Sequence, residues 1–590
     1  MQPYSSLKDT HSQELIVLKQ KHTWIGIMRI VLVCMALICF YFSITSREFI
    51  PLAIGILSIV VFPFVLVLHK KVSAEIVFKE TLVTIISQEI SYLENKELPF
   101  ENGVEYNDAN HPYSFDLDIF GQKSLFQSLN RTATYLGKTK LALSLQNILP
   151  NDEIQRNQDA IKELASKLEW RQEILARAKI ANDSKEVYAS ILKWGASEVL
   201  IIPIYIRLIS FVFPFVLFGL FAMSMVSDSG IYLNLAEFLF VVNLVVIGLQ
   251  LKTIKGERVH ADKIEILIKQ YSLILYKIEK VDVASPKLVE LKDKLTHVKI
   301  TASVHLNTLS NLFARVETIQ NAVGSLLMNG FFLYHIHSLN ALLKWKAAHA
   351  SKVAEWISVI GEIEMLNSFA NYAYNNPNFI FPELNTDCVI QLKETGHPLI
   401  DANKRICNDV TFQDGSFIIL TGSNMSGKST FLRTLGVNMM LAGAGAPICA
   451  SSATIHPLPV IVSMRLSDSL SDSESYFFAE VKRLKQLMQT LDQQACFILL
   501  DEILRGTNSD DKRSGTIGVI KKILAKKGIG IVATHDLEVC NTASDFPEQL
   551  SNKCFEVEII NDDLVFDYKL REGICKNKSA TFLMKKMGVI

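Results

Sequence analysis

A glycine-rich run at residues 422–429 has the residue types and spacing needed to hold phosphate groups. It reads Gly-Ser-Asn-Met-Ser-Gly-Lys-Ser, follows the apolar residues 417–420 and precedes a helical stretch from Thr430 to about Leu441. Glycines let backbone N–H groups turn inward around phosphates, the lysine reaches the β- and γ-phosphates, and the serine hydroxyl can hold Mg²⁺. The sequence predicts a nucleoside triphosphate site with Mg²⁺, whose phosphate-binding residues are Gly422, Ser423, Asn424, Met425, Ser426, Gly427, Lys428, Ser429 and Thr430.

A second apolar run, residues 497–500, ends in two carboxylates that could complete this site. Asp501 and Glu502 follow it directly, and an acidic pair at the carboxyl end of a buried strand suits two tasks in phosphoryl transfer. We expect Asp501 to share the Mg²⁺ ion with Ser429, and Glu502 to orient and deprotonate the attacking water. An exposed carboxylate pair at a strand end is the alternative, and the phosphate-binding loop argues against it.

A third apolar run, residues 530–533, is followed by Thr534 and His535. A lone histidine is usually structural. At the end of a third strand of the same sheet, however, His535 could hydrogen-bond the γ-phosphate and respond to its loss. The predicted catalytic residues are therefore Lys428, Glu502 and His535.

The elements that must position these residues change in character along the chain. From about residue 385, short apolar runs alternate with helical segments, which predicts an α/β P-loop ATPase domain of the ABC type with a largely parallel sheet. The preceding polar sequence predicts an all-α core and lever, with long amphipathic stretches at 260–281 and 285–314. Asparagines and prolines at 375–382 mark the boundary.

Four apolar spans interrupt the helical part, at residues 24–44, 50–68, 199–226 and 231–251. Each is long enough to cross a hydrocarbon core of about 30 Å; helices buried in a soluble core are the alternative. Basic residues flank the outer ends of each pair and the connections within the pairs are short, which places every soluble part in the cytoplasm. The sequence thus predicts four transmembrane helices in an integral protein of the inner or plasma membrane.

A weaker apolar stretch from Ser325 to Leu343 contains Asn329, His335, His337 and Asn340. If it crossed the membrane alone, the nucleotide site would lie outside the cell. We therefore expect a helix in the core or on the membrane surface. The two histidines stand two residues apart and do not share a helix face, so a metal site is not expected there.

The overall composition limits the number of domains, the charge available for binding nucleic acid and the state of the cysteines. The 590 residues have room for two to four domains, and zero formal net charge gives no global basic field for nucleic acid. The nine cysteines are scattered without a C-x-x-C pair, which is typical of reduced cytosolic thiols. The predicted domains are a cytoplasmic N-terminus (1–23), transmembrane hairpin 1 (24–68), the first part of the helical core (69–198), transmembrane hairpin 2 (199–251), the helical lever and clamp (252–380) and the ATPase domain (385–590).

Taken together, the motifs resemble the ATPase domain of the MutS family of DNA mismatch-repair proteins. The resemblance extends over about 115–195 and 256–590, and the ATPase motifs are its most specific part. The matching segments are 396–398 (Gly-His-Pro), 422–430, 475–480 (Ser-Tyr-Phe-Phe-Ala-Glu, like the family's S-x-F-x-x-E signature helix), 501–508 (Asp-Glu-Ile-Leu-Arg-Gly-Thr-Asn) and 533–535, with helical matches at 125–137, 154–164 and 364–370.

This resemblance implies an ATP hydrolase that uses ATP and Mg²⁺ as a homodimer with composite sites. Ser475 would contact the nucleotide bound by the opposite subunit, Asn508 would bind nucleotide, and Tyr568 falls near an adenine-packing position. The resemblance also implies lever arms that clamp a partner, most simply double-stranded DNA gripped through its phosphates, and a relation to mismatch repair.

The sequence also departs from the family pattern. Family members that find mismatches carry an N-terminal domain with a Phe-x-Glu wedge, whereas the residues before 115 here are mostly two apolar spans. The tripeptide is fitted by residues 78–80, 478–480 and 546–548 alike, so that match carries no information. Arg405 stands where the family has an adenine-packing aromatic residue. The chain ends at Ile590, where relatives continue into a helical dimerisation segment.

Two functions remain open at this point. One is a membrane-anchored, MutS-like ATPase whose dimer clamps DNA without reading mismatches. The other is an ATP-driven membrane switch whose arms act on a protein or lipid. An ABC-type transporter is a third possibility, but no LSGGQ-like run precedes Asp501 and four spans are few for a transport pathway.

Overall fold

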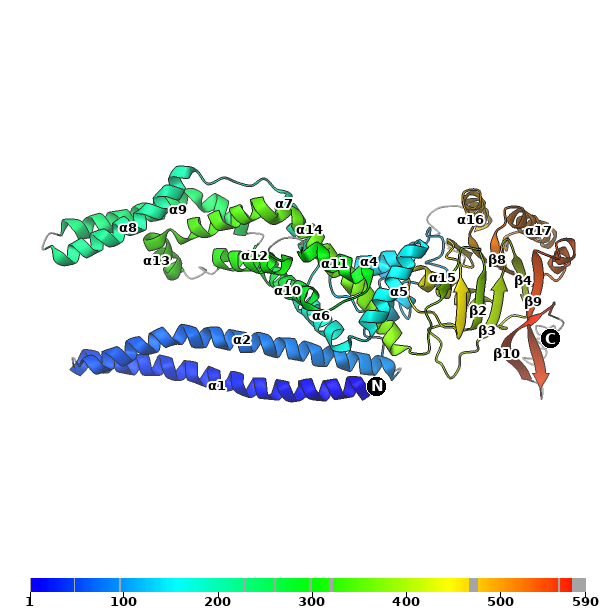
Figure 1. The fold of residues 1–590 in the computed structure, drawn as a ribbon, viewed down its shortest axis with the longest axis horizontal. Helices are drawn as coiled ribbons and strands as arrows, with labels where there is room; N and C mark the ends of the chain where they lie inside the picture. The colour runs from blue at the N-terminus through cyan, green and yellow to red at the C-terminus, as the bar shows by residue number, and fades with distance from the viewer. Residues whose placement is uncertain are drawn as a thin grey trace.

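The computed structural model describes residues 2–46, 48–94, 97–227, 230–258, 261–296, 300–317, 322–465, 476–560 and 563–575. The molecule is elongated. Helical hairpins extend toward one end, two β-sheets with their helices form the other, and a helical region joins them (Figure 1). An α/β part therefore follows a helical part, in the order that the sequence predicts.

The first hairpin consists of α1 (Gln2–Ser46) and α2 (Phe49–Leu93), which pack against each other. At 1.5 Å per residue each helix is about 67 Å long, roughly twice the thickness of a hydrocarbon core. Apolar side chains near the turn are exposed, while the polar halves continue toward the helical core. Both helices have the length and composition of a membrane span.

The second hairpin consists of α8 (Ile204–Val226) and α9 (Ile231–Arg258). The predicted start of this span at residue 199 is wrong, because residues 199–203 are not helical and Pro203, in an extended conformation, precedes α8. α8 and the Ile231–Gln250 part of α9 also have the length and composition of membrane spans. The tips of both hairpins point toward the same end of the molecule, away from the sheets (Figure 1).

Short helices form the core between the hairpins and the sheets. Several begin at a Ser or Thr whose side chain accepts a backbone N–H of the first turn, as Ser124, Thr134 and Ser184 do. The predicted stretch 285–314 is divided between two helices, α11 and α12. The helices are α3 (Leu125–Leu129), α4 (Tyr135–Gln146), α5 (Asn151–Ala165), α6 (Leu168–Ala181), α7 (Lys185–Ala196), α10 (Ala261–Lys280), α11 (Pro286–Thr296) and α12 (Ala302–Glu317), with a 3₁₀ turn η1 (Val104–Tyr106).

The stretch expected to be one helix over 325–343 is broken. α13 (Ala322–Phe332) ends at Leu333, whose φ of 44° is left-handed, and α14 (Tyr334–Asn375) begins directly after it. α14 then continues through 42 residues, about 63 Å. It runs from the second hairpin to the boundary of the sheets (Figure 1).

Two sheets form the other end of the molecule. The larger has the order β10-β9-β4-β8-β7-β6 and is parallel except for β10, and the smaller has the order β1-β5-β2-β3. The strands are β1 (Glu383–Leu384), β2 (Ile390–Thr395), β3 (Asn408–Phe412), β4 (Phe417–Gly422), β5 (Ser452–Ile455), β6 (Val460–Ser463), β7 (Phe497–Asp501), β8 (Ile529–Ala533), β9 (Leu550–Ile560) and β10 (Asp563–Glu572).

The three strands predicted from apolar runs are confirmed as β4, β7 and β8. Every residue in them is buried, because helices cover both faces of a parallel sheet, and such strands appear in sequence as continuous apolar runs. The helices of this part are α15 (Lys428–Gly443), α16 (Tyr476–Leu491) and α17 (Ser509–Ala525), with a 3₁₀ segment η2 (Val539–Asp545).

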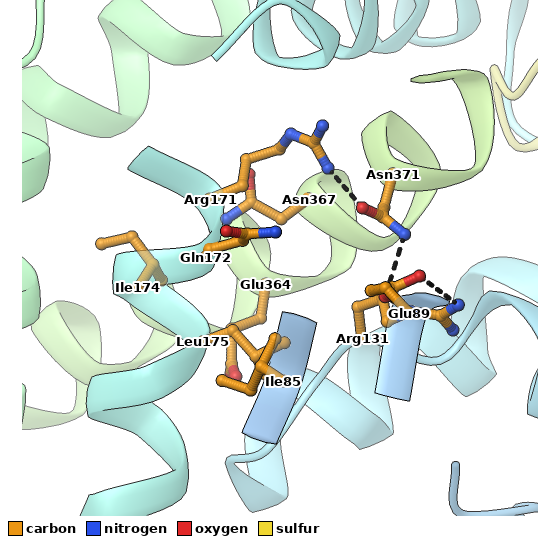
Figure 2. A pocket seen from close by; sticks show the side chains of 10 residues that line it. All are labelled: Ile85, Glu89, Arg131, Arg171, Gln172, Ile174, Leu175, Glu364, Asn367 and Asn371. Carbon is orange, nitrogen blue, oxygen red and sulfur yellow. Dashed lines mark hydrogen bonds and ion pairs between the residues drawn. The ribbon is translucent and has the colours of Figure 1, made fainter. Parts of the chain in front are cut away.

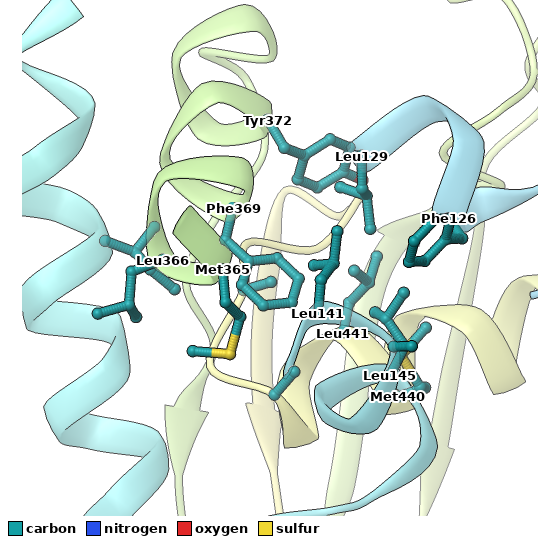
Figure 3. Close-up of a cluster of buried hydrophobic side chains, with 14 of the residues drawn as sticks. Phe126, Leu129, Leu141, Leu145, Met365, Leu366, Phe369, Tyr372, Met440 and Leu441 are labelled. Atoms are coloured by element: carbon teal, nitrogen blue, oxygen red, sulfur yellow. The ribbon is translucent and has the colours of Figure 1, made fainter. Parts of the chain in front are cut away.

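Buried side chains join α15, which starts at the phosphate-binding loop, to the helical core (Figure 3). Met440 and Leu441 of α15 belong to the same apolar cluster as Leu145 of α4 and Phe369 of α14, and all four are fully buried. The helix that carries the predicted lysine is therefore packed into the part of the core that includes the end of α14.

Candidate nucleotide-binding site

The loop between β4 and α15 has a backbone shape that few sequences allow. Met425 has a φ of 69° and Gly427 a φ of 98°, both in the left-handed region. A Cβ on Gly427 would lie 3.0 Å from the Tyr568 ring, so the loop also needs glycine for space. The N-terminus of α15 opens into this loop, and free N–H groups at a helix start attract anions.

Lys428 folds back over the loop. Its Nζ donates to the carbonyl oxygens of Gly422, at 2.9 Å, and Ser423, at 3.0 Å. Burial lowers the pKa of Lys428, partly offset by the nearby carboxylates of Glu502 and Asp501. The ammonium group is therefore held at the centre of the loop, where phosphate oxygens can replace the carbonyls as its acceptors.

The residues expected to hold Mg²⁺ lie together. Ser429 Oγ donates to Asp501 Oδ2 at 2.5 Å, joining the start of α15 to the end of β7. Mg²⁺ is commonly bound by one or two carboxylates together with substrate phosphates and water, so this hydroxyl–carboxylate pair suits it. The buried Ser426 Oγ has no hydrogen-bond partner in the structure, which also fits a loop shaped to receive a polar ligand.

Glu502 and His535 form a pair beside the loop. The Glu502 Oε1 to His535 Nε2 distance is 2.6 Å, and Glu502 adopts a left-handed φ of 48° that turns its side chain from the end of β7 toward β8. The hydrogen bond from His535 lowers the pKa of Glu502 to about 2 despite partial burial. Glu502 is thus ionised at neutral pH, the state a general base requires.

Glu480 of α16 fixes the segment that follows Glu502. Its carboxylate accepts the backbone N–H of Leu504, at 2.6 Å, and of Arg505, at 3.2 Å, where Leu504 has a left-handed φ of 61°. Burial raises the pKa of Glu480 while these hydrogen bonds lower it. The last residue of the S-x-F-x-x-E run thus supports the acidic loop, whereas its first residue, Ser475, lies outside the described residues.

These groups surround a cavity of about 460 Å³, a size typical of small-molecule sites. The 424–430 loop, Asp501, Glu502, His535 and Tyr568 all line it. The adenine-packing role of Tyr568 stays a prediction. Asn408 holds the backbone of Tyr568: its Nδ2 donates to the carbonyl of Tyr568 at 3.0 Å.

Two sequence expectations need correction. Arg405 does not line this cavity, because its guanidinium donates to the carbonyls of Ile400 and Pro398 and lies over the ring of Phe379. Asn508 is the N-cap of α17, accepting the Asp511 N–H at 2.8 Å, and does not line the cavity in the described chain.

Among the cavity-lining residues that were not predicted as site residues, three have basic side chains: His397, Lys404 and Arg505. His397 belongs to the Gly-His-Pro run, which was a usable signal, and burial lowers its pKa to about 4, so it is neutral at pH 7. Arg505 follows the acidic pair and donates to the Glu502 carbonyl at 3.0 Å. Lys404 lies in a loop without any motif.

Comparison with known proteins identifies this part of the chain. The family description "MutS domain V" matches residues 418–589. The chain therefore shares this domain with the MutS family. It is 31% identical over 252 residues to a DNA mismatch repair protein MutS from Methanococcoides burtonii, covering 41% of this chain and 28% of the relative.

Other MutS-family proteins give similar alignments. MutS protein homolog 4 from Homo sapiens is 28% identical over 239 residues, covering 39% of this chain and 25% of the relative. A DNA mismatch repair protein MutS from Finegoldia magna is 30% identical over 231 residues, covering 38% of this chain and 27% of the relative. The chain thus spans about a quarter of the length of the relatives it matches.

Proposed function

We propose that this chain is a membrane-anchored MutS-family ATPase that hydrolyses ATP in the cavity between the 424–430 loop and Tyr568. The strongest support is the convergence of three parts on one cavity. These parts are the Lys428 ammonium, the Ser429–Asp501 pair and the Glu502–His535 pair. They come from the ends of β4, β7 and β8, the edge of a parallel sheet where ligands bind.

Each group has a defined task in this proposal. Lys428 exchanges its carbonyl acceptors for phosphate oxygens of ATP. Ser429 and Asp501 would hold Mg²⁺, which would supply positive charge beside the phosphates. Glu502, released from His535, accepts the proton of the attacking water, and His535 then donates a hydrogen bond to the γ-phosphate. Tyr568 offers its ring to the base.

The test uses the full chain in lipid nanodiscs. Lys428→Ala removes a charge-assisted contact worth about 1.5–3 kcal/mol or more, so ATP affinity is expected to fall at least tenfold. Glu502→Gln is expected to retain ATP binding and lose turnover. Lys527→Ala, at a lysine that is 73% exposed, is the control and should change neither. Turnover by Glu502→Gln at the wild-type rate contradicts the assignment of the base.

The catalytic unit in this proposal is a homodimer whose sites are completed by Ser475 of the opposite subunit. Mixing Lys428→Ala with Ser475→Arg subunits leaves one site with both lesions and one intact, so mixed dimers are expected to recover partial activity. Verified heterodimers without any recovery contradict this shared arrangement.

The membrane anchor is supported by the four apolar helices, which have the length and composition of spans. Because both hairpin tips point away from the sheets (Figure 1), both can cross and return with the sheets on one side. That side is the cytoplasm, where ATP is available and where the flanking basic residues favour retention.

The ATP-driven motion acts on a partner gripped by the helical arms, and double-stranded DNA is the first candidate because relatives carry the name DNA mismatch repair protein. Phosphate contacts release counterions, so affinity should fall with salt. Reading a mispair needs an inserted wedge, whereas residues 2–93 form the first hairpin. Matched and G·T duplexes should therefore bind alike. A tenfold preference, about 1.4 kcal/mol, contradicts this.

The second candidate is a switch that acts on a protein or lipid within the membrane, favoured by the attachment of both hairpins to the helical core. A pulldown from detergent extract, carried out with and without nuclease and comparing wild type with Glu502→Gln, separates the two. DNA retained by the ATP-trapped variant supports the clamp. A protein or lipid retained after complete DNA digestion supports the switch.

A further inference from the structure

We infer that α13 and the first turns of α14 form a re-entrant helical hairpin, which enters the bilayer beside α8 and α9 and returns to the side from which it came. Its partner is the hydrocarbon of the lipids. This inference rests on the proposal that α8 and α9 span the membrane, and it adds a third membrane-embedded element to the two hairpins.

Hydrogen bonds to α8 and α9 set the depth of the break between α13 and α14. Asn243 Nδ2 donates to the Gly330 carbonyl at 2.7 Å, and His337 Nε2 donates to the Ser210 carbonyl at 2.9 Å. At 1.5 Å per residue, Ser210 lies about 9 Å from the start of α8, and Asn243 about 10 Å from Gln250, the end of the apolar part of α9. Both of those ends are cytoplasmic in the proposed topology, so these contacts lie about 10 Å inside the bilayer.

Aromatic contacts place the end of α13 deeper in the bilayer. The Phe331 ring centroid lies 6.0 Å from that of Phe218 in α8 and 5.1 Å from that of Phe240 in α9. A Cβ on Gly330 would overlap the Phe240 ring, so α13 and α9 are in close contact here. Phe240 lies about 15 Å from Gln250 along α9, near the middle of a core of about 30 Å.

The length of α13 agrees with this depth. Its 11 residues span about 16 Å, half of what a crossing requires. After the break, Lys344 is the first Lys, Arg, Asp or Glu, and it lies about 15 Å along α14 from Tyr334. The apolar segment therefore has the length to reach the middle of the bilayer and return, and the sheets stay in the cytoplasm.

Backbone groups at the break between α13 and α14 are hydrogen-bonded within the protein, as a hydrocarbon environment requires. Inside a bilayer, irregular backbone persists only where its polar groups are satisfied by the protein. The Asn329 side chain accepts the His335 N–H at 3.1 Å, and the Asn329 carbonyl accepts the Leu333 N–H at 3.0 Å. The Leu333 bond is the last regular helical bond of α13. The His335 N–H and the Gly330 carbonyl, which the interruption of the helix frees, are satisfied by the side chains of Asn329 and Asn243.

The outer face of α13 is apolar and uncovered in the structure. Leu326 is 49% exposed and Leu327 46%, and Met328 and Phe332 are also exposed. The lipid-facing surface of α8 and α9, which carries exposed residues such as Phe215 and Phe238, belongs to the helices against which α13 packs. Lipid that covers those two helices therefore also meets α13.

A re-entrant hairpin at this position determines where a movement of α14 would act. This helix begins near the middle of the membrane and, 42 residues later, ends where the sheets begin. A movement of the ATPase domain that shifts α14 along its axis is therefore delivered inside the bilayer, at the break beside α8 and α9, and not only at the membrane surface.

Photolabelling of the unmodified full chain tests this inference. The chain is placed in nanodiscs of phosphatidylcholine that carry a diazirine at the end of one acyl chain, and a parallel sample receives a water-soluble diazirine. Labelled positions are mapped by mass spectrometry. α8 and α9 are the positive control for lipid. α12 is the matched control for water, because its Val304 is 51% exposed, like Leu326.

The inference predicts lipid label on residues 322–333 at a yield comparable with α8 and α9, and at least tenfold less water-soluble label than on α12. Water-soluble label equal to that of α12 overturns it, and absence of both labels also overturns it by showing that protein covers this face. If α8 and α9 themselves lack lipid label, the proposed membrane anchor fails instead, so the two failures are distinguishable.

Discussion

The two helical hairpins are attached to the same helix, α14, but at opposite ends and by different chemistry. The second hairpin meets α13 through rings and an amide hydrogen bond, as at Phe331 and Asn243. It meets the start of α14 through the hydrogen bond of His337 and a small apolar cluster that includes Ile336. The first hairpin meets the last turns of α14 through a buried network of charges (Figure 2). Rings can slide past one another at little cost, whereas a buried ion pair holds one geometry.

The charged network connects five segments of the chain. Glu89 of α2 pairs with Arg131, and both are almost fully buried. Asn371 of α14 donates to Glu89 at 3.3 Å and accepts from Arg171 of α6 at 2.8 Å (Figure 2). Tyr4 of α1 also donates to Asn371, at 3.3 Å. The first hairpin is therefore attached to the end of α14 next to the ATPase domain through a buried ion pair and polar groups, whereas the second is attached through apolar side chains and single hydrogen bonds.

The largest expected loss of stability comes from breaking the buried ion pair that attaches the first hairpin. Arg131→Ala leaves Glu89 buried without its partner, and such a loss costs about 3–5 kcal/mol. Thermal and denaturant unfolding of the full chain in nanodiscs measures it. Lys19→Ala, which removes an exposed pair with Glu80 in the same hairpin, is the control, and exposed pairs contribute about 1 kcal/mol or less. Equal losses in the two variants contradict a special role for the buried pair.

The second expected effect is a pH dependence of the free energy of unfolding, which arises close to the charged network. Glu364 of α14 accepts the backbone N–H of Ala133 at 2.8 Å, two residues after Arg131. Complete burial raises the pKa of Glu364 to about 7, against opposing hydrogen bonds. Because the folded state holds the proton more tightly, the stabilisation is complete below pH 4.5 and is lost as pH rises through 7. It amounts to roughly 3 kcal/mol, at about 1.4 kcal/mol per pKa unit.

Glu364→Gln, which cannot ionise, should remove this part of the pH dependence. Denaturant unfolding at pH 5 and pH 8 measures it, and the variant should lose less stability between the two values than wild type. Glu362→Gln is the neighbouring control, since nearby lysines lower the pKa of Glu362 against its own burial. An unchanged pH dependence in Glu364→Gln shows that Glu364 is already ionised in the folded protein.

The smallest loss of stability is expected where α13 packs against α9 of the second hairpin. Gly330→Ala places a methyl group against the Phe240 ring, and overpacking typically costs about 1–3 kcal/mol. Gly248→Ala in α9 is the matched control, because a Cβ there meets nothing within 4 Å. Unfolding in nanodiscs should show a loss only for Gly330→Ala. The same stability for both variants indicates that α13 does not pack closely on α9.

The same contrast explains what could be predicted from the sequence. β4, β7 and β8 are buried throughout, and the residues that follow them are fixed by local motifs, so strands and candidate site residues were visible together. The N-cap role of Asn508 was not predicted; the structure shows it through the hydrogen bond from the Asp511 N–H. Its assignment to nucleotide binding followed the family motif instead.

Contacts between distant segments were not predictable. Glu89 and Arg131 are 42 residues apart, and Asn243 and Gly330 are 87 apart. Their residue types are ordinary, and only the fold brings them together. The break at Leu333 was missed for a related reason: no Gly or Pro stands at that position. The left-handed turn depends on Asn329 and on the partner helix α9, which the local sequence does not show.

The central claim is that α14 connects the nucleotide site to both hairpins. Hydrogen–deuterium exchange of the Glu502→Gln chain in nanodiscs, with and without ATP, tests it most directly. We expect altered exchange in α15, in the last turns of α14 beside Asn371, and at the break near Leu333. Altered exchange confined to the sheets and α15–α17, with α14 unchanged at both ends, would contradict it.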